Sequence, residues 1–230
     1  MLRRLAAIVL FSAACNLSAE EIKADPATPK GAAVAMFKAM EAGDVAAAKK
    51  LATGNEKQLG LLDSMVPLMN GFKTLEISAV KKFGDDGKKI LQGDAGGPGP
   101  SLDIEKELTG AKEEIAGETA TITPTGADSS KQPMKFKKVD GSWKIDLASM
   151  PTEGLDNPAA MTMVKAMGGL ARDTAKEIDD NKYKTVEEAK TAMQQKMLPI
   201  ILQAAAANQG GAAVPPPPVV ETPKDPKDQK

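Results

Sequence analysis

The stretch KKVDGSWKIDL, residues 137–147, is typical of a β-hairpin, because an Asp-Gly pair between alternating apolar residues favours a two-residue turn. With Asp140 and Gly141 at the tip, the large apolar side chains of both strands fall on one face, which we expect to cover the core. The predicted cross-strand pairs are Val139 with Ser142, Lys138 with Trp143, Phe136 with Ile145, Met134 with Leu147, and Lys135 with Asp146. Trp143, the only tryptophan, is interpreted as a core residue partly covered by the Lys138 stem, and not as a ligand-stacking residue.

Three helices are predicted before this hairpin, because apolar residues recur there at three- and four-residue spacing. The predicted spans run from Thr28 to Gly43, from Asp44 to Gly54 and from Asn55 to Gly71. Thr28, Asp44 and Asn55 are the expected N-caps, and Gln58 completes a capping box with Asn55.

Further strands are predicted where the apolar period changes to two residues. Alternation over residues 75–79 predicts a first strand, residues 102–104 offer a short one, and GETATIT (residues 117–123) predicts another. Asp85, Asp86 and Gly87 indicate a turn. The Gly-rich residues 93–100 lack the lysine and hydroxyl of a phosphate-binding loop and are interpreted as a plain loop.

Beyond residue 150 the helical spacing returns and predicts a helical hairpin over residues 151–209. One helix opens at Asn157-Pro158, and Thr185 with Glu188 forms the capping box of the next. Several methionines of this pair are interpreted as core filler, with a partner-binding groove as the alternative. They are Met161, Met163, Met167, Met193 and Met197. Residues 210–230, which contain four consecutive prolines, are expected to form a disordered Pro-rich tail.

The N-terminus carries the pattern of a secretory signal peptide over residues 1–19, with Arg3 and Arg4 before a short apolar run. The mature chain is therefore expected to be extracytoplasmic, in the periplasm or secreted, and no segment predicts a transmembrane helix. Two alternatives remain for Cys15, the only cysteine. The residues before it resemble a bacterial lipobox, which predicts lipidation of Cys15 and a membrane tether, whereas an ordinary leader would simply be removed.

Composition excludes several functions. The chain has 230 residues, a formal net charge of −1 and no histidine, so the commonest general base and transition-metal ligand is missing. The balanced charge predicts no nucleic-acid partner. Neither a cofactor nor a metal site is predicted, since the acidic pairs lack the ligand spacing of a calcium loop. These pairs are Asp85-Asp86, Asp103/Glu105 and Asp179-Asp180. Catalysis would fall to carboxylates, lysines, hydroxyls or Tyr183, and no catalytic residue is predicted.

The order of these elements resembles the nuclear transport factor two-like superfamily, and in particular its extracytoplasmic bacterial branch of unknown function. Residues 33–51, 117–123 and 136–147 carry the resemblance. It implies an α+β fold over residues 26–150, with N-terminal helices packed on a curved antiparallel sheet that forms a cone. Some relatives use the pocket between sheet and long helix for catalysis, and others use it only for binding or dimerisation. The catalytic tyrosine, aspartate or histidine of the enzymes in this superfamily cannot be assigned to positions of this chain. It has no histidine, and its only tyrosine, Tyr183, lies outside residues 26–150.

We therefore expect a noncatalytic module that binds a small apolar ligand or a protein partner, with a homodimer included, at residues that the pattern does not identify. The alternative is a lyase or isomerase in which a buried carboxylate acts as base. The predicted strand faces place Asp103, Glu105 and Asp146 outward, which argues against it. In a third, structural alternative, the C-terminal helices close the cone.

Overall fold

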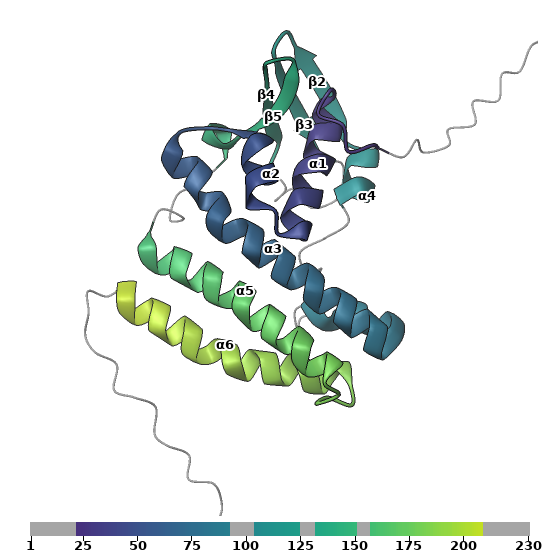
Figure 1. Ribbon diagram of the computed structural model, residues 1–230, viewed down its shortest axis with the longest axis vertical. Coiled ribbons are helices and arrows are strands. Elements are labelled where there is room, and N and C mark those ends of the chain that lie inside the picture. Colours follow the sequence, from purple (N-terminus) through teal and green to yellow (C-terminus); the bar gives the residue numbers. More distant parts are fainter. Residues whose placement is uncertain (1–21, 93–103, 125–131, 151–156, 209–230) are drawn as a thin grey trace, which may run out of the picture.

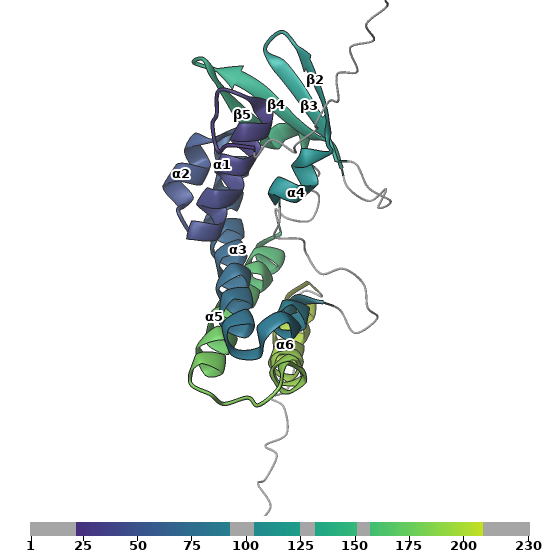
Figure 2. The ribbon, with the colours of Figure 1, turned by 90° about the vertical axis from the view of Figure 1, so that its right-hand side faces the viewer.

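A five-stranded mixed sheet and three smaller helices lie at one end of a long helix, α3 (Figures 1 and 2). A second long helix, α5, lies along another side of α3, and α6 packs on α5. This computed structural model describes residues 22–92, 104–124, 132–150 and 157–208. The architecture is α+β, as predicted. The helices are α1 (Pro29–Ala42), α2 (Val45–Lys50), α3 (Glu56–Phe83), α4 (Ile104–Thr109), α5 (Pro158–Asp179) and α6 (Val186–Asn208), with 3₁₀ turns η1 (Gly84–Leu91) and η2 (Leu147–Ser149). The strands are β1 (Ala52–Thr53), β2 (Lys112–Ala116), β3 (Thr119–Thr123), β4 (Met134–Val139) and β5 (Ser142–Asp146).

The predicted hairpin is formed by β4 and β5, and the predicted pairs from Val139–Ser142 to Phe136–Ile145 are confirmed. Asp140 and Gly141 have φ of 52° and 80°, the left-handed conformation that a two-residue hairpin turn requires. The pair of Met134 with Leu147 is wrong. Leu147 has already left the strand for η2, and Met134 pairs with Ile122 of β3 instead.

The sheet has the order β1-β5-β4-β3-β2. It was expected to be antiparallel throughout, but β1 pairs parallel with β5, and only the other pairs are antiparallel. The strand predicted in GETATIT is β3. Strand β2 was not predicted, because all of its residues are exposed and its sequence, KEEIA, lacks a buried alternation. On the β1 side of β5, two further backbone hydrogen bonds join β5 to the chain before α1 and before β1: Trp143 N donates to Pro26 O (2.7 Å), and Ile145 N donates to Leu51 O (2.9 Å).

The predicted N-caps are confirmed. Thr28 accepts a hydrogen bond from Gly31 N, Asp44 from Ala47 N, and Asn55 forms a complete capping box with Gln58. The second helix ends before the predicted stop at Gly54, because the chain turns into β1.

Helix α3 is longer than predicted and overturns the first predicted strand. It continues through Gly71 to Phe83, so residues 75–79 are helical. Leu75 and Ala79 are fully buried while Ile77 between them is 57% exposed, which is the spacing of a helix. Five residues of alternating polarity are compatible with both a strand and a helix. Residues 75–79 are helical because they continue the preceding turns of α3.

Gly71 is required for close packing and does not end the helix. A Cβ atom at this position would lie 2.5 Å from the carbonyl oxygen of Gly168 in α5, so the two backbones touch. Arg172 of α5 reinforces the crossing by donating a hydrogen bond to Pro67 O at 2.8 Å. A glycine in a helical pattern can therefore indicate either the end of a helix or a close contact with a second helix, and the sequence does not distinguish the two.

Two other expectations change. The turn predicted at residues 85–87 belongs to the 3₁₀ turn η1. The short strand predicted over residues 102–104 is wrong at Ile104, which begins helix α4, whereas residues 102 and 103 lie outside the described residues.

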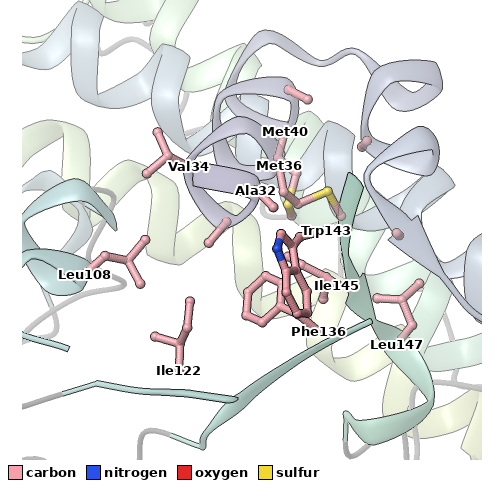
Figure 3. Close-up of a cluster of buried hydrophobic side chains, with 14 of the residues drawn as sticks. Ala32, Val34, Met36, Met40, Leu108, Ile122, Phe136, Trp143, Ile145 and Leu147 are labelled. Carbon is pink, nitrogen blue, oxygen red and sulfur yellow. The ribbon is translucent and has the colours of Figure 1, made fainter. Parts of the chain in front are cut away.

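The first core lies between the sheet, α1, α2, α4 and the first half of α3. Phe136, Trp143 and Ile145 extend from the sheet toward Met36 and Met40 of α1 (Figure 3). Trp143 is 4% exposed, and the Lys138 ammonium lies 5.8 Å from its ring centre. The interpretation of Trp143 as a core residue beneath the Lys138 stem is confirmed.

The second core lies between the other half of α3, η1, α5 and α6. It is built from few large side chains, such as Leu75, Ile90 and Ile178, and from alanines. The predicted openings of both C-terminal helices are confirmed: Asn157 caps α5, and Thr185 accepts from Glu188 N. The Glu188 carboxylate accepts from Lys184 N, one residue before the expected capping-box donor.

The signal peptide, Cys15, the Gly-rich loop and the Pro-rich tail lie outside the described residues and stay predictions. Within the described ranges, no helix combines the length and apolar character needed to cross a bilayer.

Candidate functional site

An apolar pocket of about 240 Å³ lies between the first turns of α3 and the end of the sheet where β4 begins and β5 ends. We name it the α3–sheet pocket. Its walls come from three places: the start of α3, the start of β4 and the chain that leaves β5. The lining residues are Gln58, Leu61, Leu62, Met65, Gln132, Pro133, Met134, Leu147, Ser149 and Met150.

Local structure holds each wall in place. The Gln58 side chain accepts a hydrogen bond from Asn55 N at 2.9 Å, which fixes the first turn of α3 and leaves Leu61 and Met65, four residues apart, on the pocket side. On the opposite wall, Asp146 caps η2 by accepting from Ala148 N, and this turn directs Leu147 and Met150 to the pocket.

The chemistry of the lining is neutral. Glutamine amides and one serine hydroxyl supply its polar atoms, and the rest of the surface is aliphatic or thioether. Its lining residues include no titratable group that could act as a general acid or base. A cavity of about 150 Å³ accommodates benzene, so this pocket is large enough for a neutral apolar molecule somewhat bigger than one ring. Met65, Met134 and Met150 can adapt to different shapes.

Of the carboxylates weighed as catalytic bases, none among the described residues lines this pocket. Asp146 was predicted to lie outward in solvent, yet it is only 8% exposed, because β1 and η2 cover it. It pairs with Lys137 at 3.0 Å and not with the predicted Lys135. Glu105 was predicted on a strand but lies on α4 and pairs with Lys38 at 2.7 Å. Asp103 lies outside the described residues.

Tyr183 belongs to a separate polar cluster at the join of α5 and α6. Its hydroxyl donates to Glu177 at 2.6 Å, and Glu177 also accepts from Lys182 and Lys196. The Lys196 bond, followed by the Tyr183 bond, holds the pKa of Glu177 at about 2, although burial acts in the opposite direction. Burial, and then the bond to Glu177, raises the pKa of Tyr183. A carboxylate so strongly held in its ionised form joins two helices and is a poor proton acceptor near neutral pH.

Three carboxylates of the acidic pairs form hydrogen bonds to other side chains. Asp85 and Asp86 bond to Lys88 and Lys89, and Asp179 to Ser78. Within the described segments, no group of three acidic or cysteine side chains is arranged to hold a metal ion.

Sequence reasoning identified no ligand-binding residue, and the α3–sheet pocket shows why. The helical spacing places Leu59, Leu62, Met65 and Met69 on one inner stripe, whereas Leu61, next to that stripe, lines the pocket together with Leu62 and Met65. Met134 was predicted as a core residue of the hairpin face, and Met150 lies beyond the end of β5, where no periodicity marks it.

In comparisons with known proteins, no family model, no curated protein and no solved structure matches this chain.

Proposed function

We propose that this protein is a noncatalytic binding module that takes a small, neutral, apolar ligand in the α3–sheet pocket. One observation carries the proposal: the pocket has apolar walls, a few neutral polar atoms and no titratable side chain. Ligand sites are concave, mostly apolar and equipped with a few polar groups that orient the ligand. Gln58, Gln132 and Ser149 would supply the orienting contacts.

The resemblance to the nuclear transport factor two-like proteins supports the same location. In that family the pocket lies between the sheet and the long helix, which are the elements that line the α3–sheet pocket here. We infer that the pocket corresponds to the mouth of such a cone. The residues that line it include none from α5 or α6, so the C-terminal helices need not close it.

The leader of residues 1–19 supports an extracytoplasmic module, either free or tethered through a lipidated Cys15. Mass spectrometry of the protein purified from its native envelope separates these cases. A lipid-sized mass on Cys15 indicates a tether, a chain cut before or after that residue without added mass indicates a free module, and an uncut leader contradicts both.

A binding titration tests the pocket directly. The full chain is titrated with 1-naphthol, a neutral fluorescent molecule of suitable size, and binding is followed by fluorescence and by isothermal calorimetry. A ligand of this size gains about 0.3 to 0.5 kcal/mol per non-hydrogen atom, so we expect saturable binding with Kd between about 0.1 and 4 mM.

A pair of tryptophan variants on one helix provides the control. Leu61→Trp fills the pocket and should abolish binding, whereas Ile77→Trp lies on an exposed part of α3 and should leave it unchanged. The absence of saturable binding, or equal binding by both variants, would overturn the proposal.

A further inference from the structure

The second half of α6 is apolar around nearly its whole circumference and yet lies at the outside of the molecule (Figure 1). Leu198, Ile201 and Leu202 are 58%, 42% and 52% exposed. A helix that is hydrophobic all round is normally buried. This segment therefore presents an apolar stripe that nothing in the described chain covers; with Ala205 we name it the α6 stripe.

The inward side of the same segment is also incompletely filled. Ile200 and Ala204 line a hollow of about 420 Å³ together with Met163 and Ala166 of α5. The two helices therefore pack less tightly at this end than at the other end, where Val186 and Ala189 are buried in the second core.

Charge is almost absent from this part of the surface. Between Thr191 and Ala206 the only charged residue is Lys196, and its ammonium group bonds to Glu177. In the whole chain, by contrast, 27% of residues are charged. A charged partner would find no complementary group on the stripe, and a membrane-binding helix would carry lysines and arginines beside its apolar face.

We propose that the α6 stripe is the contact surface for a second copy of this chain, in a two-fold symmetric dimer. An isologous contact places the same surface on both sides, so a neutral stripe meets a neutral stripe without like-charge repulsion. Leu198, Ile201, Leu202 and Ala205 have the i, i+3, i+4, i+7 spacing of a helix-packing stripe.

The spacing also specifies the register. When two α6 helices pack antiparallel about a point between Ile201 and Leu202, each Leu198 lies opposite Ala205 of the other copy, and each Ile201 lies opposite Leu202. A leucine then faces an alanine at each end of the contact, and the two central pairs are isoleucine with leucine, so the small residues leave room for the large ones of the other copy. This contact is separate from the α3–sheet pocket, so neither proposal depends on the other.

Sedimentation equilibrium of the full chain tests the dimer. Over a range from about 5 to about 500 µM, the weight-average mass should rise toward twice the monomer mass. The double variant Leu198→Lys, Leu202→Lys buries four ammonium groups in the contact and should raise the dimer dissociation constant at least about tenfold. Ile77→Lys, an equally exposed position on α3, should leave it unchanged.

Charge complementation tests the register. Leu198→Lys and Ala205→Glu should each weaken self-association, and a mixture of the two chains should restore a heterodimer, because the introduced ammonium group of one chain then faces the introduced carboxylate of the other. Both positions are exposed, so unchanged circular dichroism and melting will show that the variants fold.

Three outcomes would overturn the dimer: a chain that stays monomeric throughout, association that the double variant does not weaken, or a mixture that fails to associate. A monomer that binds phosphatidylcholine vesicles through the α6 stripe would identify a lipid surface as the occupant instead, and this also contradicts the proposal.

Discussion

The two cores of this protein share one helix but pack in different ways. In the first core, α3 meets the sheet through large side chains, with Phe136 and Trp143 filling the interior. In the second, α3 meets α5 through Gly71 and Gly168, whose backbones approach to contact distance. Figure 2 shows the sheet and the C-terminal helices at opposite ends of the molecule, joined by α3.

The difference shows where a ligand could enter. Large side chains on a sheet and a helix leave irregular gaps at the edge of their contact, and the α3–sheet pocket is such a gap. Helices that touch through small residues leave no space at the contact, so the middle of the α3–α5 crossing is rigid and closed. The first core therefore carries the proposed binding site, and the second stabilises the helix that forms its wall.

The largest expected effect tests whether the cores unfold together. Phe136→Ala removes a buried ring and should destabilise the protein by about 3 to 5 kcal/mol. Because α3 belongs to both cores, calorimetry should still show one transition, and the fluorescence of Trp143 should change together with the helical circular dichroism. Ile115→Ala, at an exposed position of β2, should change the stability by less than about 0.5 kcal/mol. Two separate transitions in the Phe136→Ala variant would show that the cores are independent.

A pair of glycines on α3 compares the two ends directly. A Cβ atom at Gly71 would meet the Gly168 backbone, so Gly71→Ala should destabilise by about 1 to 3 kcal/mol despite its better helix propensity. At Gly60, at the pocket end, no described residue outside the adjacent backbone of α3 lies within 4 Å of such a Cβ, and Gly60→Ala should stabilise by up to about 1 kcal/mol. Chemical denaturation measures both changes, and equal signs would contradict the described crossing.

The smallest effect concerns the polar cluster that joins α5 to α6. The pKa of Glu177 is about 2, below its ordinary value of 4.5, so its ionised form stabilises the folded state above pH 4.5 and this contribution is lost as the pH falls toward 2. Glu177 is 20% exposed and solvent screens the cluster, so Glu177→Gln should cost about 1 kcal/mol at pH 7. At pH 2, where about half of the folded molecules carry a protonated Glu177, the cost should be a small part of that. Urea unfolding at the two pH values measures the difference. Glu118→Gln, at an exposed turn, is the control, and a cost for Glu177→Gln that does not change with pH would be inconsistent with this cluster.

Local signals predicted local structure well. Thr28, Asp44 and Asn55 begin their helices as expected, and Asp140-Gly141 sets the register of the hairpin, because caps and tight turns depend on residues within a few positions of each other. The strand predicted over residues 75–79 was wrong, because its secondary structure depends on the long helix before it and not on nearby residues. A short alternation has no local feature that distinguishes a strand from one turn of a long helix.

The candidate site was less predictable. Its residues come from α3, β4 and η2, which are distant in the sequence, and no shared period or motif links Leu61 to Met134 or Met150. The burial of Asp146 was missed as well, because it depends on β1, a two-residue strand that no pattern announces.

By itself the sequence determined the α+β class, the hairpin around Trp143, the starts of every described helix except α4, and the absence of histidine chemistry. Only the tertiary structure decided that α3 continues past Gly71, that two cores share it, and that a neutral pocket and an uncovered α6 stripe result. The physical reason is that caps and turns are short-range interactions, whereas the close approach of Gly71 to Gly168 and the gap beside Leu61 exist only between segments that folding brings together.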